Sequence, residues 1–248
     1  MIQLNNISVI FGKNTALESI ALQKINLHMT SGDFIILIGS NGAGKSTLLQ
    51  LLAGSMSPTH GNIYFDKINI THLSVEERAK WVAHVYQDPR LGTCEAFTIE
   101  ENLAFAFNRG KKRGLKPALN HQMRKHFQSL LVDLDMGLEN RLTDDVATLS
   151  GGQRQALSLM MATLQPSKIL LLDEHTAALD PKTAKTVLSI TQRIISQHRL
   201  TTVMVTHNMA HALEMGNRTL LMQQGKIIRD LSQEQRKQLT QAELIQFL

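Results

Sequence analysis

Short apolar segments along the chain predict the strands of a buried sheet. They are rich in β-branched residues and bounded by polar or turn-forming residues, which is typical of strands. Apolar residues also recur with helical spacing, at 48–52 after one segment and at 156–162 before another. Strands that alternate with helices in this way predict an α/β core with a mostly parallel sheet. The expected strands cover residues 3–11, 34–38, 62–65, 82–86, 169–172, 201–206, 218–222 and 226–228.

The middle of the chain has a different pattern. From Glu100 to about Leu164 there is no convincing strand, and the apolar positions follow helical spacing. We therefore expect one domain of 248 residues, in which a helical subdomain at 88–164 is inserted between two parts of an α/β core, at 1–87 and 165–248.

Composition excludes several classes of protein. With 248 residues, 43% of them hydrophobic, the chain can bury a core and is not expected to be disordered. Its longest aliphatic runs, at 34–38 and 169–172, are far shorter than the roughly 20 apolar residues that span a bilayer, and no secretory signal pattern opens the sequence. The single cysteine, Cys94, fits a reducing compartment. The net charge of +5 favours an anionic partner, which composition leaves open among nucleotide, nucleic acid and lipid headgroups.

A glycine-rich segment follows the strand expected at 34–38. It reads Gly-Ser-Asn-Gly-Ala-Gly-Lys-Ser-Thr and precedes a helical pattern, which is the context of a Walker A phosphate-binding loop. Glycines allow the tight curl that points N–H groups at a phosphate, and the helix adds its dipole. We expect Lys45 to reach the β- and γ-phosphates and Ser46 to bind Mg²⁺; the alternative is an ordinary glycine-rich turn. The expected nucleotide-binding residues are Gly39, Ser40, Asn41, Gly42, Ala43, Gly44, Lys45, Ser46 and Thr47.

Two carboxylates follow the apolar strand expected at 169–172. Asp173 would lie at the carboxyl edge of the sheet, where it could hold Mg²⁺ directly or through water. Glu174 would then be placed to orient or deprotonate the attacking water. Two acids after a strand can also form a solvated loop, but a Walker A loop lacks the carboxylate that the metal needs. The pair therefore favours a Mg²⁺–nucleotide site.

A second candidate phosphate site begins at Ser150. Residues 149–153 read Leu-Ser-Gly-Gly-Gln, and Ser150 and Gln153 fit a capping box, so the simplest interpretation is an N-capped helix. Two glycines before a capped helix also leave N–H groups available to an anion. Because the chain already has one phosphate loop, this second site is most useful if it closes over a nucleotide held by another copy of the chain.

With these motifs in this order, the chain resembles the ATP-binding cassette (ABC) ATPases, whose signature is Leu-Ser-Gly-Gly-Gln. The resemblance covers nearly the whole chain. It implies a P-loop NTPase fold with a mostly parallel core sheet, an N-terminal antiparallel β subdomain and an inserted helical subdomain. It also implies that Ser150, Gly151, Gly152 and Gln153 act in trans, on nucleotide bound by the partner in a head-to-tail dimer.

The same resemblance assigns further roles. Gln87 matches the Q-loop glutamine, which touches Mg²⁺ or the attacking water and joins the helical subdomain to the core. Asp180 matches the D-loop, and His207 matches the switch histidine near the γ-phosphate. Phe11 is the candidate for the ring that stacks on adenine, where the family usually has tyrosine. His175 stands where the family commonly has proline, and it either tunes the base or only fills space.

His207 also lies four residues before His211, a spacing that two metal ligands on a helix can use. Asn208 occupies the place of the glutamate in a His-Glu-x-x-His zinc motif, so the switch role is favoured over zinc.

The resemblance indicates a Mg²⁺-dependent ATPase subunit, peripheral on the cytoplasmic face of the cell membrane. It would energise separate transmembrane permease subunits, with a separate solute-binding protein, and the sequence is similar to proposed importers of aromatic amino acids such as tryptophan or tyrosine. One alternative is a soluble ABC ATPase that acts on DNA or the ribosome, but such proteins usually have long coiled coils or two cassettes. Another, a small-molecule P-loop kinase, leaves residues 149–153 and His207 unexplained.

Residues 109–125 hold seven basic residues and no acidic ones. They form either a solvated loop or a surface near an anionic leaflet, where each cation contributes about 1 kcal/mol. Nucleic acid binding is not expected, because no aromatic residues are interleaved with the charges. The basic residues are Arg109, Lys111, Lys112, Arg113, Lys116, Arg124 and Lys125.

Overall fold

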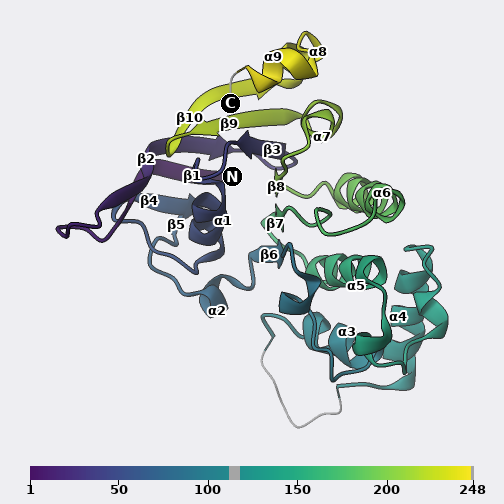
Figure 1. The fold of residues 1–248 in the computed structure, drawn as a ribbon. Helices are drawn as coiled ribbons and strands as arrows, with labels where there is room; N and C mark the ends of the chain where they lie inside the picture. Colours follow the sequence, from purple (N-terminus) through teal and green to yellow (C-terminus); the bar gives the residue numbers. More distant parts are fainter. Residues whose placement is uncertain (112–117, 247–248) are drawn as a thin grey trace.

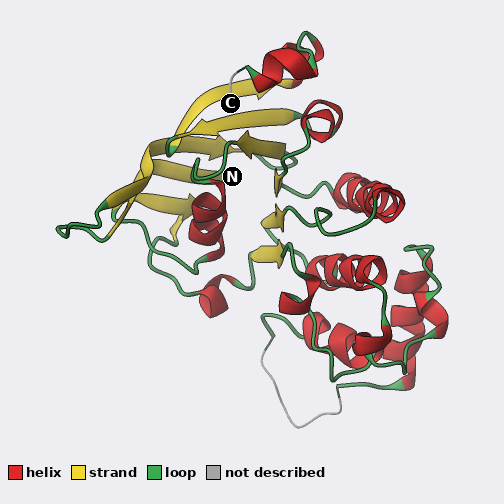
Figure 2. Ribbon diagram, in the orientation of Figure 1, coloured by secondary structure: helices red, strands yellow, loops and turns green. Residues whose placement is uncertain are grey.

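Two β-sheets organise the computed structural model, which describes residues 1–111 and 118–246 (Figure 1, Figure 2). The larger sheet is mostly parallel, as its apolar strands predict, and only one edge strand pairs antiparallel with its neighbour. In spatial order its strands are β10 (Lys226–Ser232), β9 (Arg218–Gln223), β3 (Phe34–Gly39), β8 (Thr202–Val205), β7 (Ile169–Asp173) and β6 (Val82–Val85).

The smaller sheet is the expected N-terminal antiparallel subdomain, and it contains two strands that the sequence analysis missed, at 19–29 and 68–69. The longer of the two has a bulge where Lys24 adopts φ 49°, so its buried side chains jump from Leu22 to Ile25. This shift breaks the alternation of apolar and polar residues by which a strand is recognised. In spatial order the strands are β2 (Ser19–Met29), β1 (Ile2–Phe11), β4 (His60–Phe65) and β5 (Ile68–Asn69).

Apolar layers cover both faces of the larger sheet. From β3, Ile35 and Leu37 join one core, together with the smaller sheet and the helix that follows β3, whereas Ile36 and Ile38 join the other. Burial on both faces explains why the central strands are uninterrupted apolar runs. The helices that follow strands β3, β7 and β8 are α1 (Lys45–Ala53), α6 (Pro181–His198) and α7 (Met209–Glu214).

Between β6 and β7 the described residues form helices and turns without a named strand, as predicted. The helices share a core with one face of the larger sheet, and Phe127 lies fully buried in it. The bounds 88–164 for this subdomain remain a prediction. Its α-helices are α3 (Ile99–Phe107), α4 (His121–Val132) and α5 (Gly151–Thr163), with 3₁₀ turns at Pro89–Leu91, Leu138–Asn140 and Val146–Thr148.

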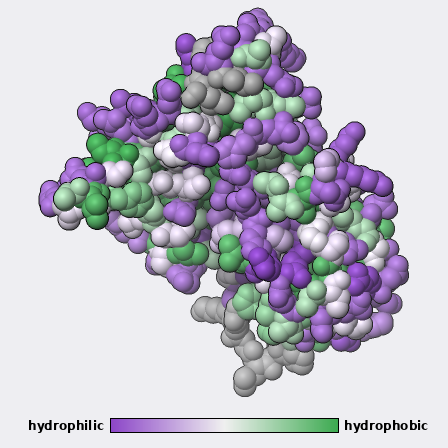
Figure 3. All heavy atoms as spheres, in the orientation of Figure 1, coloured by the Kyte–Doolittle hydropathy of each residue, from purple (hydrophilic) through white to green (hydrophobic). Residues whose placement is uncertain are grey.

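The remaining helices are short. Helix α2 (Val75–Arg78) follows the smaller sheet, and α8 (Gln233–Lys237) and α9 (Gln241–Ile245) follow β10 and lie near α7 (Figure 1). No described helix is both long and apolar enough to cross a membrane. Hydrophilic residues predominate on the face that Figure 3 shows.

Candidate functional site

The loop between β3 and α1 is a tight turn that excludes side chains at two of its glycines. Gly44 has φ 100°, and a Cβ there would lie 2.6 Å from the carbonyl oxygen of Ala21. A Cβ on Gly39 would lie 2.4 Å from the carbonyl oxygen of Met222. The loop leads directly into α1, whose first N–H groups have no acceptors within the helix. This geometry suits a phosphate and accounts for these two glycines.

Lys45 lies over this loop and is buried. Its Nζ donates hydrogen bonds to the carbonyl oxygens of Gly39 (2.8 Å) and Ser40 (2.9 Å). Burial lowers the pKa of Lys45, and the nearby charges of Glu174 and Asp173 oppose that shift. The ammonium group is therefore held at the mouth of the loop, close to two carboxylates, where an anionic ligand would meet it. Of the other loop residues, Ala43 is buried and Thr47 partly buried, while Ser40, Asn41, Gly42 and Ser46 are exposed.

Asp173 ends β7 at the carboxyl edge of the sheet, as predicted, and Glu174 follows it. Burial, and then the neighbouring charge of Glu174, raise the pKa of Asp173. A carboxylate in this position would be stabilised by a cation. Glu174 adopts φ 44°, a strained conformation for a residue with a side chain, and its N–H donates to the carbonyl of Val205 on β8.

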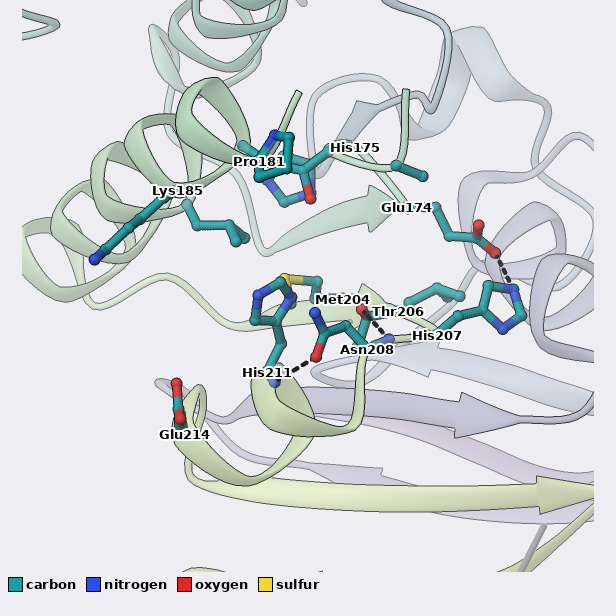
Figure 4. A pocket seen from close by; sticks show the side chains of 15 residues that line it. Glu174, His175, Pro181, Lys185, Met204, Thr206, His207, Asn208, His211 and Glu214 are labelled. Atoms are coloured by element: carbon teal, nitrogen blue, oxygen red, sulfur yellow. Dashed lines mark hydrogen bonds and ion pairs between the residues drawn. The ribbon is translucent and has the colours of Figure 1, made fainter. Parts of the chain in front are cut away.

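Glu174 meets His207, which follows β8. The distance from Glu174 Oε1 to His207 Nε2 is 2.7 Å, and Figure 4 shows the two side chains pointing at each other. Glu174 is 18% exposed and His207 47% exposed, so the pair is accessible from one side. They lie at the edge of a cleft of about 760 Å³ whose other walls come from α6 and α7. The arrangement can orient a water molecule and accept its proton.

The helix expected to begin at Ser150 has the predicted capping box. Ser150 Oγ accepts the N–H of Gln153 (3.2 Å), and the Gln153 side chain accepts the N–H of Ser150 (3.2 Å). Gly152 packs against α6, because a Cβ on it would lie 2.1 Å from Thr183 Cγ2. Gly151 lies beside Leu179. The signature thus adjoins the segment that leads into α6.

Asp180 has a local structural role. Its carboxylate accepts the N–H groups of Lys182 and Thr183, both at 3.1 Å, and so caps α6. These hydrogen bonds lower the pKa of Asp180. The side chain thus fixes the start of the helix against which Gly152 packs.

Gln87 and Phe11 lie at the ends of strands. Gln87 is exposed and follows β6, two residues beyond its last paired residue. Phe11 ends β1, opposite Ser19, and its ring is 45% exposed. The adjoining strand β2 reaches the phosphate loop through Ala21, whose carbonyl oxygen would lie 2.6 Å from a Cβ on Gly44, and the stacking role of Phe11 remains a prediction.

His175 is a buried residue in the wall of the same cleft, where it packs against α6 (Figure 4). It is 2% exposed, and its Nε2 lies 3.0 Å from Thr191 Oγ1 on α6. The Thr191 hydroxyl donates to the carbonyl of Val187, so His175 donates to Thr191. Burial, with a smaller contribution from His211, lowers the pKa of His175 to about 4. These contacts favour the interpretation that His175 fills space.

The polar residues of this site suit a magnesium ion that is bound together with a nucleotide better than a metal ion held by protein side chains alone. The described part of the chain holds no cluster of three or more His, Cys, Asp or Glu side chains able to bind a metal, which counts against zinc at His207 and His211. Asp173 and the exposed hydroxyl of Ser46 are hard oxygen donors at neighbouring element ends, and such donors with phosphate oxygens are what Mg²⁺ takes.

Some cations of the basic stretch also make contacts within the protein, and its role as a surface remains a prediction. Arg109 donates to the carbonyl of Gln165 (3.0 Å), and Arg124 forms two hydrogen bonds with the buried Glu100 (2.7 and 2.9 Å). Lys111 Nζ lies 3.8 Å from the centre of the Phe107 ring. Internal contacts therefore engage three of the seven predicted surface cations. Lys112, Arg113 and Lys116 lie outside the described residues.

The sequence analysis missed two buried arginines. Arg78 is 1% exposed and Arg236 is 3% exposed, and both donate to main-chain carbonyls at the ends of helices. Their sequence surroundings carry no motif, and a buried arginine cannot be told from a surface one by its neighbours in sequence.

Comparisons with known proteins agree with the geometry. The family model described as ABC transporter matches residues 22–177. The chain is 40% identical over 246 residues to a tyrosine transport ATP-binding protein of Clostridioides difficile, covering 99% of this chain and 98% of that one. It is 34% identical over 254 residues to the methionine import ATP-binding protein MetN of Streptococcus agalactiae, covering 97% and 68%. A solved dimer of the ATP-binding cassette MJ0796 with ADP and Pi superposes with a TM-score of 0.79, at 26% identity, over 94% of this chain and 99% of that one.

Proposed function

The chain belongs to the ABC transporter family of ATP-binding proteins, and from this premise we propose that it hydrolyses ATP to drive a membrane permease that imports an aromatic amino acid, tyrosine being the first candidate. The observation that carries the proposed chemistry is the contact between Glu174 and His207 beside Lys45 and Asp173. The family accounts for ATP binding and hydrolysis; the residue roles and the solute are our proposal.

In this proposal Glu174 accepts the proton of the attacking water. His207 holds the Glu174 carboxylate in place and reaches the γ-phosphate side of the site. Lys45 leaves its two carbonyl acceptors for the β- and γ-phosphates, which offer charged oxygens instead. Mg²⁺, held by Ser46, Asp173 and Gln87, would neutralise the charge that develops on the phosphates.

A second copy of the chain would complete each site. Ser150, Gly151, Gly152 and Gln153 would bind the γ-phosphate of the partner's nucleotide, and Asp180 would support this contact by fixing the start of α6. Ser150 Oγ accepts the N–H of Gln153, and the exposed Gly151 at the start of α5 leaves room for a phosphate to approach. The MJ0796 cassette forms a dimer, which supports the same arrangement here.

The helical subdomain offers the surface for the permease. Leu91 is 70% exposed and Phe97 43% exposed, and both follow Gln87 closely in sequence. Large apolar side chains on an exposed segment that adjoins a nucleotide site suit a protein partner whose position depends on the nucleotide. Because the permease carries the solute path, the protein would be peripheral on the cytoplasmic face of the membrane. A solute-binding protein would deliver the amino acid from the other side.

Transport in a reconstituted system tests this proposal. The chain and its co-purifying membrane subunits would be placed in vesicles, and ATP-dependent uptake of labelled tyrosine, tryptophan and methionine measured. We expect uptake of tyrosine that stops with Glu174→Gln. Uptake of methionine alone would contradict the solute, and co-purification with ribosomes or DNA instead of membrane subunits would contradict transport. The relatives, all named for transport, give no support to that alternative.

A further inference from the structure

Arg236 lies beneath the carboxyl end of α7, the helix that follows His207. It is 3% exposed and belongs to α8, in the last described part of the chain. Its guanidinium donates to the carbonyl oxygens of Gly216 (2.7 Å), Ala212 (2.9 Å) and Leu213 (2.8 Å), and also to that of Met215. One side chain therefore binds two carbonyl groups in the last turn of α7, at Ala212 and Leu213, and two in the segment just beyond it; Thr219 Oγ1 also donates to Ala212 (3.0 Å).

Helix α7 depends on such contacts because it has only six residues. A helix this short is not stable by itself, so its ends must be fixed from outside. Its carboxyl end lacks the left-handed cap that usually satisfies the last carbonyls, since Met215 is extended. The cation of Arg236 supplies the missing donors, and it also lies at the negative end of the helix dipole.

The amino end of α7 is joined directly to His207. Asn208 caps the helix, accepting the N–H groups of Ala210 (2.9 Å) and His211 (3.4 Å). The N–H of Asn208 donates to Thr206 Oγ1 (3.1 Å), at the end of β8 (Figure 4). His207 is thus held between a fixed strand and a helix whose far end rests on Arg236. A shift of α7 moves the main chain of Asn208 and, with it, the imidazole.

We infer that Arg236 is a positioning residue for ATP hydrolysis, which keeps His207 within hydrogen-bond distance of Glu174 by fixing α7. This inference rests on the proposed roles of Glu174 and His207. It connects the C-terminal segment of the chain, which has no motif, to the geometry of the hydrolytic site.

Kinetics of the full-length chain test the inference. Arg236→Met removes all the donors, whereas Arg236→Lys keeps the charge but cannot reach four carbonyls at once. We expect kcat for ATP hydrolysis to fall about 10- to 100-fold in the methionine variant and less in the lysine variant, with KM for ATP changed by less than about twofold. A kcat within about twofold of the parent protein in both variants would overturn the inference.

A matched control separates positioning from general loss of stability. Arg78 is equally buried and donates to the carbonyls of Leu51 (2.6 Å) and Leu52 (3.1 Å), near the carboxyl end of α1. Since α1 begins at Lys45, we expect Arg78→Met to weaken nucleotide binding more than it lowers kcat. If the two methionine variants change kcat and KM in the same way, the effect is general destabilisation and the inference is wrong.

Two further measurements separate this inference from the proposed function. Spectra of protein labelled with ¹⁵N-histidine should show the His207 ring signals shifted or broadened in Arg236→Lys, and unchanged signals would contradict positioning whatever the activity. When Arg236→Met is added to His207→Ala, kcat for ATP hydrolysis should fall by less than a further factor of about two. If Arg236→Met lowers kcat by the same factor in His207→Ala as in the parent protein, the inference is wrong. Undiminished hydrolysis by His207→Ala alone would instead contradict the proposed role of His207.

Discussion

Glu174 and His207 face each other from the ends of two adjacent parallel strands, with Glu174 Oε1 2.7 Å from His207 Nε2. The contact depends on strand register, because Asp173 pairs with Val205 and therefore places Glu174 level with the residues that follow β8. Glu174 itself adopts a left-handed conformation, φ 44°, where the chain leaves β7. The site is thus defined by the sheet as much as by the motifs.

Glu174→Gln is expected to lower ATP hydrolysis by about 10²- to 10⁴-fold, because an amide keeps the hydrogen bond to His207 but cannot accept the proton of water. ATP should still bind, so a dimer with trapped ATP should appear in size-exclusion chromatography. Glu76→Gln, in the exposed first turn of α2, serves as a control that should keep normal hydrolysis. Substantial hydrolysis by Glu174→Gln would exclude Glu174 as the base.

Gly44→Ala is expected to weaken nucleotide binding by about tenfold or more, because the added Cβ lies 2.6 Å from the carbonyl of Ala21 and the loop must shift. Gly32→Ala is a matched control, since Gly32 also has a positive φ, 86°, but its Cβ would meet no atom within 4 Å. Gly32→Ala should cost about 1 kcal/mol of stability and leave binding unchanged. Fluorescent-nucleotide titration measures both variants, and equal affinities would show that the close approach to β2 is unimportant.

The sequence predicted those parts of the molecule whose functional residues are neighbours along the chain. The phosphate loop, the carboxylates after β7 and the capping box at Ser150 each occupy one short segment, and the structure places each at the predicted end of an element. Strand β2 escaped prediction because the bulge at Lys24 interrupts its alternation.

Contacts between distant segments were beyond prediction for another reason. Arg236 and α7 are separated by two strands, and only the folded chain shows that the guanidinium meets the helix end. The pairing of Arg124 with Glu100 was not predicted for the same reason, since it depends on how α3 and α4 pack.

The pH dependence of stability is expected to depend on buried histidines. Burial lowers the pKa of His175, and that of His84, to about 4. Between that value and the ordinary pKa of 6.5 the unfolded chain binds more protons than the folded one, so the folded state loses stability as the pH falls through this window. Each such histidine contributes a slope of up to about 1.4 kcal/mol per pH unit.

Urea unfolding at several pH values would measure this slope. His175→Gln keeps a donor for Thr191 but does not titrate, so it should flatten the slope, and His84→Phe should remove a separate part of it. A slope unchanged in both variants would show that other groups control acid unfolding.

The contact between Gly152 and Thr183 predicts a variant that binds ATP normally but hydrolyses it more slowly. In Gly152→Ala the new Cβ would lie 2.1 Å from Thr183 Cγ2, so the start of α5 must move away from α6. The change lies away from Lys45, and nucleotide binding by a single protomer should stay within about twofold of the parent protein. Hydrolysis should fall about tenfold or more, because the signature would no longer meet the partner's nucleotide correctly. Thr183→Ser removes the clashing methyl group, so the double variant should regain most of the lost activity. Phosphate release and nucleotide titration of the two single variants and the double variant test this prediction. A double variant no more active than Gly152→Ala would show that the loss of hydrolysis does not arise from the clash with α6.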